Sequence, residues 1–154
     1  MGRNILSVIV GYITMFIVVF VSFTVAYLAM GEDRAFKAGL YEVSTLWIVT
    51  SVVLGTVAAI AGGIVCALVS RRSKGAVMSL MILVLVLGGL TFVMEMQKPE
   101  LTGEDAVRGP GTSNTEAMMN ARQPMWALVS NPIIGAVGVY VGASLMRRKD
   151  SAST

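Results

Sequence analysis

The sequence has no histidine and a single cysteine, Cys66. Without histidine, the chain has no imidazole ligand for haem or zinc and no histidine base for a catalytic triad. A redox dithiol needs two cysteines, so thiol–disulfide exchange within the chain is excluded as well. These absences remove much of the common enzymatic chemistry, and we expect neither a metal site nor a cofactor.

Charged residues are also scarce, at 14% of the chain, against about 25% in an ordinary soluble domain. Hydrophobic residues make up 55%, and the clustering of the few charges leaves four long apolar stretches. About 20 apolar residues are enough to cross the bilayer core. We therefore predict an all-α membrane protein, a single compact bundle of four transmembrane helices over 1–154, with spans at about 5–30, 43–69, 76–96 and 125–146.

Basic residues gather on one side of this predicted topology. The N-terminus, the SRRSKG turn at 70–75 and the C-terminal segment together carry seven Lys and Arg and one acid, Asp150. The positive-inside rule places these segments in the cytoplasm, and an even number of spans requires both termini on one side. We expect a bacterial inner-membrane protein with lipid as its surroundings. Its short basic clusters lie beside the membrane and do not predict nucleic-acid binding.

The two predicted outer loops differ in composition. GEDRAFKAGLYEVS, at 31–44, mixes charges with apolar residues and predicts a brief amphipathic turn. The second loop, 97–124, contains TGEDAVRGPGTSNT, whose Gly, Ser, Thr and acidic residues predict a flexible extracytoplasmic loop. Its last part, EAMMNARQPMW at 116–126, predicts a short helix that enters the fourth span.

Small residues recur at every fourth position in SVVLGTVAAIAGGIVCA, 51–67. Because each helical residue turns about 100° from the last, these residues share one face of a helix. Helices inside a bilayer associate where small residues allow their backbones to approach closely. The first and fourth spans carry similar faces, and the third, the most lipid-like, is expected to cover them. The predicted packing positions are Gly11, Ser51, Gly55, Ala59, Gly63, Gly135, Gly138 and Gly142.

An aromatic stripe follows the opposite side of the first span. It is formed by Tyr12, Phe16, Phe20, Phe23 and Tyr27. The stripe either meets lipid or lines a groove for a lipophilic ligand, and the sequence leaves both interpretations open.

Asn131 is the most notable polar residue within a predicted span. The following Pro132 removes a backbone donor and leaves the Leu128 carbonyl without its usual partner, which predicts a kink in the fourth helix. Glu42 and Glu95 lie at the outer margins of the second and third spans. With Asn131 they form the candidate ligand or transport residues of a polar outer mouth. The alternatives are a hydrogen bond of Asn131 across a helix interface and simple solvation of the helix ends.

No charged residue lies deep within a span, so we predict no catalytic residue. The leading hypothesis is a non-enzymatic assembly, accessory or membrane-organising protein that acts through small-residue helix packing, with a partner membrane protein or as a homo-oligomer. The alternative is a small transporter or channel component that uses Asn131, Glu42 and Glu95. A lipid-handling enzyme, suggested only by the aromatic stripe and the outer loop, ranks third.

Overall fold

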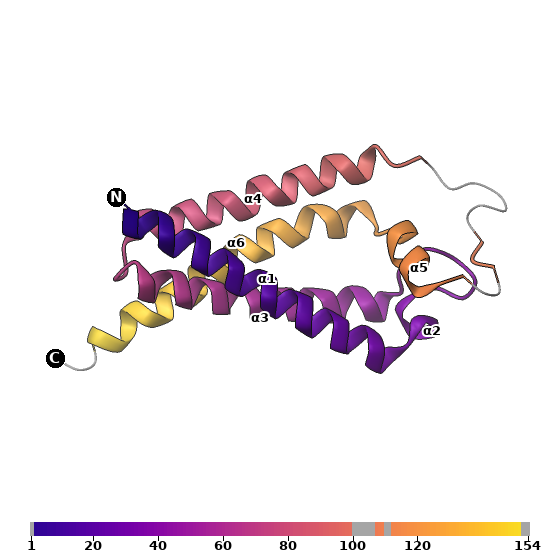
Figure 1. The fold of residues 1–154 in the computed structure, drawn as a ribbon, viewed down its shortest axis with the longest axis horizontal. Coiled ribbons are helices and arrows are strands. Elements are labelled where there is room, and N and C mark those ends of the chain that lie inside the picture. The colour runs from indigo at the N-terminus through magenta and orange to yellow at the C-terminus, as the bar shows by residue number, and fades with distance from the viewer. Residues whose placement is uncertain (1, 100–106, 110–111, 152–154) are drawn as a thin grey trace.

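Four long helices dominate the computed structural model of the chain, which describes residues 2–99, 107–109 and 112–151. They are α1 (Gly2–Met30), α3 (Thr45–Val69), α4 (Lys74–Met96) and α6 (Met125–Ser151) (Figure 1). Each contains a segment long and apolar enough to cross a membrane. Two short helices, α2 (Glu32–Ala35) and α5 (Asn114–Asn120), lie in the loops. The predicted all-α bundle of four transmembrane helices is therefore confirmed.

The bundle has two distinct ends, as Figure 1 shows. The N-terminus, the turn between α3 and α4, and the C-terminus lie at one end, which we call the inner end. The loops that contain α2 and α5 lie at the other, the outer end. The inner turn is tight, because Arg71 and Arg72 take the left-handed backbone conformation, with φ of 51° and 65°.

α3 is the central helix of the bundle, and one of its sides packs against α6. Gly63 allows the approach, because a Cβ atom at this position would lie 2.2 Å from the carbonyl oxygen of Val139. Gly142 of α6 makes the reciprocal contact, since a Cβ there would lie 2.1 Å from the carbonyl oxygen of Ile60. A Cβ on Gly138 would lie 2.8 Å from that of Ala59. The backbones of the two helices therefore touch where small residues meet.

The other side of α3 packs against α1. A Cβ on Gly62 would lie 2.8 Å from the Gly11 carbonyl oxygen, and a Cβ on Gly11 would lie 2.8 Å from the Cβ of Cys66. Ser7, one turn before Gly11, is fully buried. The small-residue face at 58–67 thus contacts two helices of the same chain.

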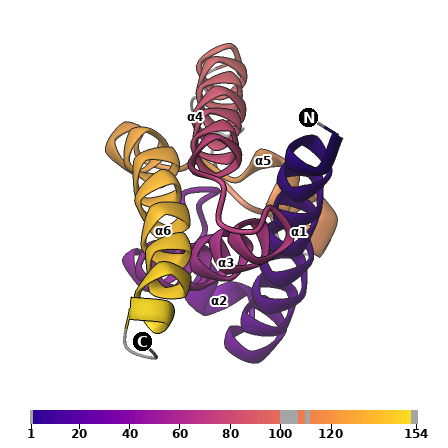
Figure 2. The same ribbon diagram turned by 90° about the vertical axis from the view of Figure 1, so that its left-hand side faces the viewer.

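α4 lies opposite α3, with α1 and α6 on either side, as the end-on view in Figure 2 shows. At the inner end its Leu80 is fully buried, 3.1 Å from where a Cβ on Gly11 would stand. Further out, Gly88 packs on Pro132, whose Cβ would lie 2.3 Å from a Cβ at position 88. α6 continues through Pro132 without interruption, and the kink expected there stays a prediction. Toward the outer end α4 and α1 diverge (Figure 1).

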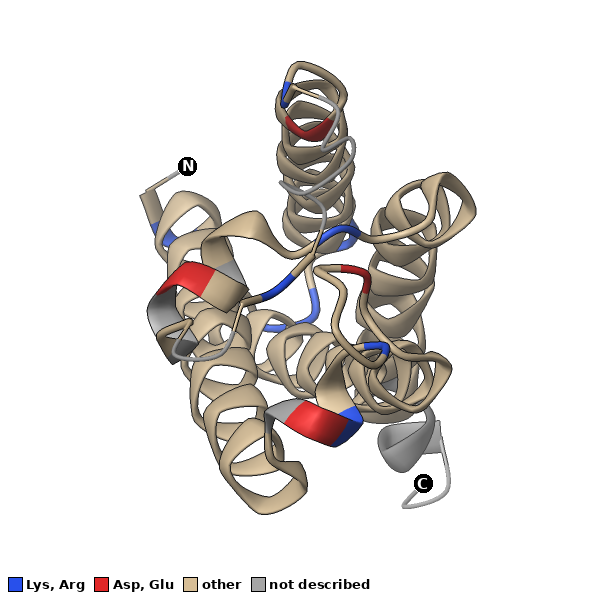
Figure 3. Ribbon diagram, turned by 90° about the vertical axis from the view of Figure 1, so that its right-hand side faces the viewer, with Lys and Arg blue, Asp and Glu red and all other residues tan. Residues whose placement is uncertain are grey.

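The two outer loops join into a cap, made of residues 31–44, 107–109 and 112–124. Their backbones pair: Arg108 N donates to Gly39 O at 2.8 Å, Arg122 N to Tyr41 O at 2.9 Å, and Val43 N to Arg122 O at 3.1 Å. Charged residues of both signs gather on this end, as Figure 3 shows. Residues 100–106 and 110–111, in the loop predicted to be flexible, lie outside the described residues.

The helix predicted to lead directly into the fourth span is corrected in one respect. α5 ends at Asn120, and α6 begins at Met125. Between them, residues 121–124 pair with the first loop instead of continuing the helix, because the Arg122 backbone bonds to Tyr41 and Val43. This short segment, which we call the strap, crosses the outer end of the bundle.

Candidate functional site

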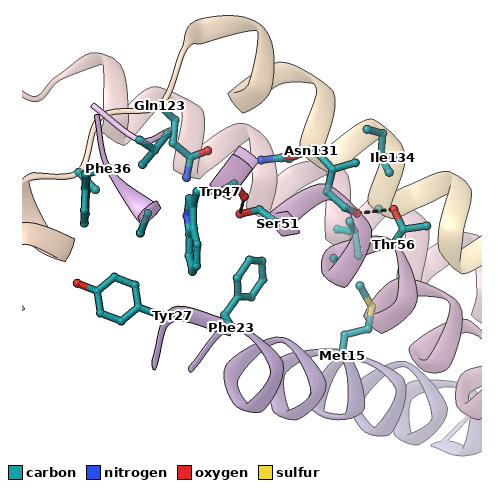
Figure 4. Close-up of a pocket in the computed structure, with 17 residues that line it drawn as sticks. Met15, Phe23, Tyr27, Phe36, Trp47, Ser51, Thr56, Gln123, Asn131 and Ile134 are labelled. Carbon is teal, nitrogen blue, oxygen red and sulfur yellow. Dashed lines mark hydrogen bonds between the residues drawn. The ribbon is translucent and has the colours of Figure 1, made fainter. Parts of the chain in front are cut away.

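A cavity of about 460 Å³ lies beneath the cap, in the outer half of the bundle. Pockets that bind small molecules usually measure about 300–1,000 Å³. The wall draws on all four long helices and on the cap (Figure 4). Its residues are Met15, Phe23, Tyr27, Ala35, Phe36, Val43, Trp47, Ser51, Val52, Gly55, Thr56, Val84, Ala121, Gln123, Asn131, Ile134 and Gly135.

In this half of the bundle, no neighbouring helix comes close enough to the small face of α3 to touch Gly55. A Cβ on Gly55 would meet no atom within 4 Å, in contrast to Gly62 and Gly63. The Ser51 hydroxyl donates to the carbonyl of Trp47 in its own helix, at 2.7 Å. We therefore place Ser51 and Gly55 on the wall of a cavity instead of in a helix contact. Gly135, also expected to pack, lies on the same wall, where its Cβ would be 3.1 Å from Val84.

Aromatic rings form the outer part of the wall. Trp47 of α3 lies between two rings of α1, with its centroid 5.9 Å from that of Phe23 and 5.8 Å from that of Tyr27. By contrast, Phe16 and Phe20 stack on each other on the outside of the bundle and are 60% and 64% exposed. The aromatic stripe of α1 thus divides, with Phe16 and Phe20 on the outer surface and Phe23 and Tyr27 on the cavity.

The polar groups on the wall are few and uncharged. The Thr56 hydroxyl donates a hydrogen bond to the carbonyl oxygen of Val52, at 2.7 Å. Asn131 and Gln123 contribute side-chain amides, each with two donors and one acceptor oxygen. The Asn131 side chain makes no hydrogen bond to any described residue. No Asp, Glu, Lys or Arg is among the described lining residues, so the cavity suits an apolar molecule with a small hydrogen-bonding group.

The structure separates the three residues predicted to form a polar mouth. Asn131 lines the cavity, whereas Glu42 and Glu95 belong to ion pairs of the outer end. Glu42 pairs with Lys37. Glu95 accepts from Lys98 at 2.6 Å and lies 3.8 Å from the Arg122 guanidinium.

A second hollow, which we call the cleft, lies beside the cavity at the outer surface and measures about 450 Å³. Unlike the cavity, it carries charged side chains of both signs. Its wall consists of Lys37, Glu42, Val43, Thr45, Ile48, Arg122, Gln123, Pro124 and Trp126. Val43 and Gln123 are therefore common to both hollows.

Several lining residues carry no signal in the sequence. Gln123 lies outside any helix, and its place follows from the pairing of the strap with the first loop. Val84 and Met15 resemble every other apolar residue of a span. The fourfold spacing of small residues did point to Gly55, although it predicted a contact there.

The groups that line the cavity are apolar side chains and a few uncharged polar groups. The described part of the chain holds no group of three or more His, Cys, Asp or Glu that could ligate a metal ion. The described wall of the cavity also lacks a charged base. A comparison with protein-family models, with curated proteins and with solved structures finds no match for this chain.

Proposed function

We propose that this protein is a non-enzymatic integral membrane protein that binds a lipophilic molecule in the outer half of its bundle. The cavity supports this function, because it joins aromatic and aliphatic walls to the amides of Asn131 and Gln123, without a charged side chain among its described residues. Pockets for small molecules combine an apolar wall with a few polar groups in this way.

The proposal includes an orientation in the membrane. Arg3, Arg71, Arg72 and Lys74 lie in segments of the inner end. The positive-inside rule then puts that end, with both termini, in the cytoplasm of a bacterial inner membrane. The cavity falls in the outer leaflet, from which a lipophilic molecule would enter.

An assembly role has less support than the sequence suggested. The small residues at 58–67 are in contact with α1 and α6 of the same chain, so a partner helix would need another surface. A transport role draws support from one observation, the place of Asn131 on the cavity wall. Uptake or release of the bound molecule would then begin from the same site.

Two glycines provide a matched test of the site. A Cβ on either Gly55 or Gly89 would meet no atom within 4 Å, but Gly55 lines the cavity and Gly89 lies on the exposed side of α4. The protein in lipid nanodiscs would be labelled with a fatty alcohol that carries a photoreactive diazirine in its chain. Labelled peptides would then be identified by mass spectrometry.

We expect saturable labelling of Phe23, Trp47 and the α6 segment around Asn131. Gly55→Leu should place a side chain inside the cavity, obstruct the ligand and lower this labelling about tenfold, whereas Gly89→Leu should leave it unchanged. Labelling confined to Phe16 and Phe20, which are exposed on the outside of α1, would contradict the proposal. Equal labelling of the two variants would contradict it as well.

A further inference from the structure

The cavity and the cleft together point to the class of molecule that is bound. We infer that the ligand is a zwitterionic amphiphile with one acyl chain, whose chain occupies the cavity and whose head, a phosphate linked to an ammonium group, occupies the cleft. This inference rests on the proposed function, because it names the ligand of the same site.

The two hollows adjoin each other. They share Val43 and Gln123, and the Gln123 amide is directed toward the cavity (Figure 4). One face of α3 runs along both: Thr45 and Ile48 line the cleft, and Val52, Gly55 and Thr56 line the cavity. The spacing of these five positions keeps them on one side of a helix, at about 100° per residue. The inferred ligand therefore follows this face of α3 from the cleft into the cavity.

The depth of the two hollows matches the two parts of an amphiphile. The cleft lies at the first turns of α3 and α6, beside Thr45 and Trp126, and Trp126 is 60% exposed. Tryptophan prefers this depth, at the level of the lipid headgroups. Ser51 to Thr56 lie about 9 to 16 Å further along the α3 axis, at 1.5 Å per residue. The cleft thus lies where a head belongs and the cavity where an acyl chain belongs.

The charges of the cleft favour a head that carries both signs. Lys37 and Glu42 pair with each other, and their side chains are 54% and 56% exposed. A zwitterion can replace both halves of this pair, with its phosphate at Lys37 and its ammonium at Glu42. The indole of Trp126, on the same wall, offers the ammonium a cation–π contact.

Other heads match this set of charges less well. A carboxylate head would form an ion pair with Lys37, but the Glu42 carboxylate beside it would repel it. An uncharged hydroxyl head would leave the Lys37–Glu42 pair intact and would add little to the free energy of binding. Arg122 already bonds to the Pro99 carbonyl and lies near Glu95, so it forms a fixed part of the wall.

Three photoreactive probes that share one acyl chain and differ only in the head would test the inference. The heads are phosphocholine, carboxylate and hydroxyl, and the measured quantity is the probe concentration that half-saturates labelling at Trp47. We expect phosphocholine to bind about tenfold tighter than hydroxyl. Lys37→Gln and Glu42→Gln should each weaken binding of the phosphocholine probe about fivefold, which is the scale of one exposed charge pair.

The controls separate this inference from the proposed function. Both charge variants should label normally with the hydroxyl probe, which shows that they are folded. Lys98→Gln removes an equal charge from a residue that lines neither hollow, and it should change nothing.

If the three probes bind equally, or the carboxylate probe binds tightest, the inference of a zwitterionic head is wrong. The proposed function then still holds, provided that Gly55→Leu blocks the labelling. If no probe labels the cavity, the proposed function and this inference both fail.

Discussion

The inner and outer halves of α3 carry similar small residues and use them in opposite ways. In the inner half, Gly62 and Gly63 bring α3 so close to α1 and α6 that no side chain fits between the helices. In the outer half, Ser51 and Gly55 face an open cavity. The difference comes from the neighbours, because the backbones of α1 and α6 reach Gly62 and Gly63, whereas a Cβ on Gly55 would meet no atom within 4 Å.

This difference shows that a small residue in a membrane helix has two structural uses. It can admit the backbone of another helix, or it can leave room for a ligand. The residue and its spacing are the same in both cases. Only the position of the second helix decides which of the two applies, and substitutions along α3 can separate them.

The largest effect is expected from Gly63→Leu. Its side chain would collide with the Val139 backbone, whose carbonyl oxygen lies 2.2 Å from the position of the Cβ. Backbone cannot move aside as a flexible side chain does, so we expect a loss of at least about 3 kcal/mol in the free energy of unfolding. Unfolding in mixed micelles by increasing denaturing detergent measures it.

Gly55→Leu, eight residues earlier on the same helix, is the control for Gly63→Leu. Its free energy of unfolding should stay within about 0.5 kcal/mol of the parent, the range of substitutions that disturb no contact. Equal losses at the two positions would mean that the outer half of α3 is packed as tightly as the inner half.

A smaller loss is expected from Gly142→Ala, at the second close contact between α3 and α6. The added methyl group would stand 2.1 Å from the Ile60 carbonyl oxygen, so the helices must separate slightly. We expect a loss of about 1–3 kcal/mol in the same unfolding experiment. Gly135→Ala should lower the free energy of unfolding by less, because its methyl group would meet only a Val84 side-chain atom, at 3.1 Å.

Asn131→Leu should change binding more than stability. The side chain is exposed to the cavity and makes no hydrogen bond to a described residue, so its loss should alter the free energy of unfolding by less than about 0.5 kcal/mol. A photoreactive alcohol short enough for its hydroxyl to lie in the cavity should lose one hydrogen bond and bind about fivefold more weakly. Unfolding and photolabelling measure the two quantities. A large loss of stability with unchanged labelling would show that Asn131 is structural.

A small gain in stability is expected at the inner turn, from Arg71→Gly. Arg71 takes a φ of 51°, which glycine adopts without the crowding that a Cβ causes. The free energy of unfolding should rise by about 0.5–1 kcal/mol. Arg71→Ala, which keeps the Cβ and also removes the charge, is the control and should bring no such gain.

Much of the fold follows from the sequence, because the cost of burying polar groups in lipid acts on each segment separately. Four apolar runs give four spans whatever their neighbours are. The small face at 58–67 likewise shows where a helix can approach. Neither observation says which helix approaches α3 or how far along α3 the contact extends. Both depend on how all four helices pack together.

The candidate site was less accessible to sequence reasoning for the same reason. Asn131 stood out as a polar residue in a span, and it does line the cavity. Glu42 also stood out, and it lines the cleft, whereas Glu95 pairs with Lys98 and Arg122 at the outer end. Gln123 reaches the cavity only because the strap pairs with residues that precede it by about 80 positions. No local pattern carries that information.

The pairing of the two outer loops also has a consequence for the order of folding. The α1–α3 contact at Gly11 and Gly62 can form as soon as the first two spans are inserted. The first loop gains its backbone partners at Arg108 and Arg122 only after the chain has been synthesised past the third span. A nascent chain would therefore hold the α1–α3 contact while both the cap and the α6 wall of the cavity were still to form.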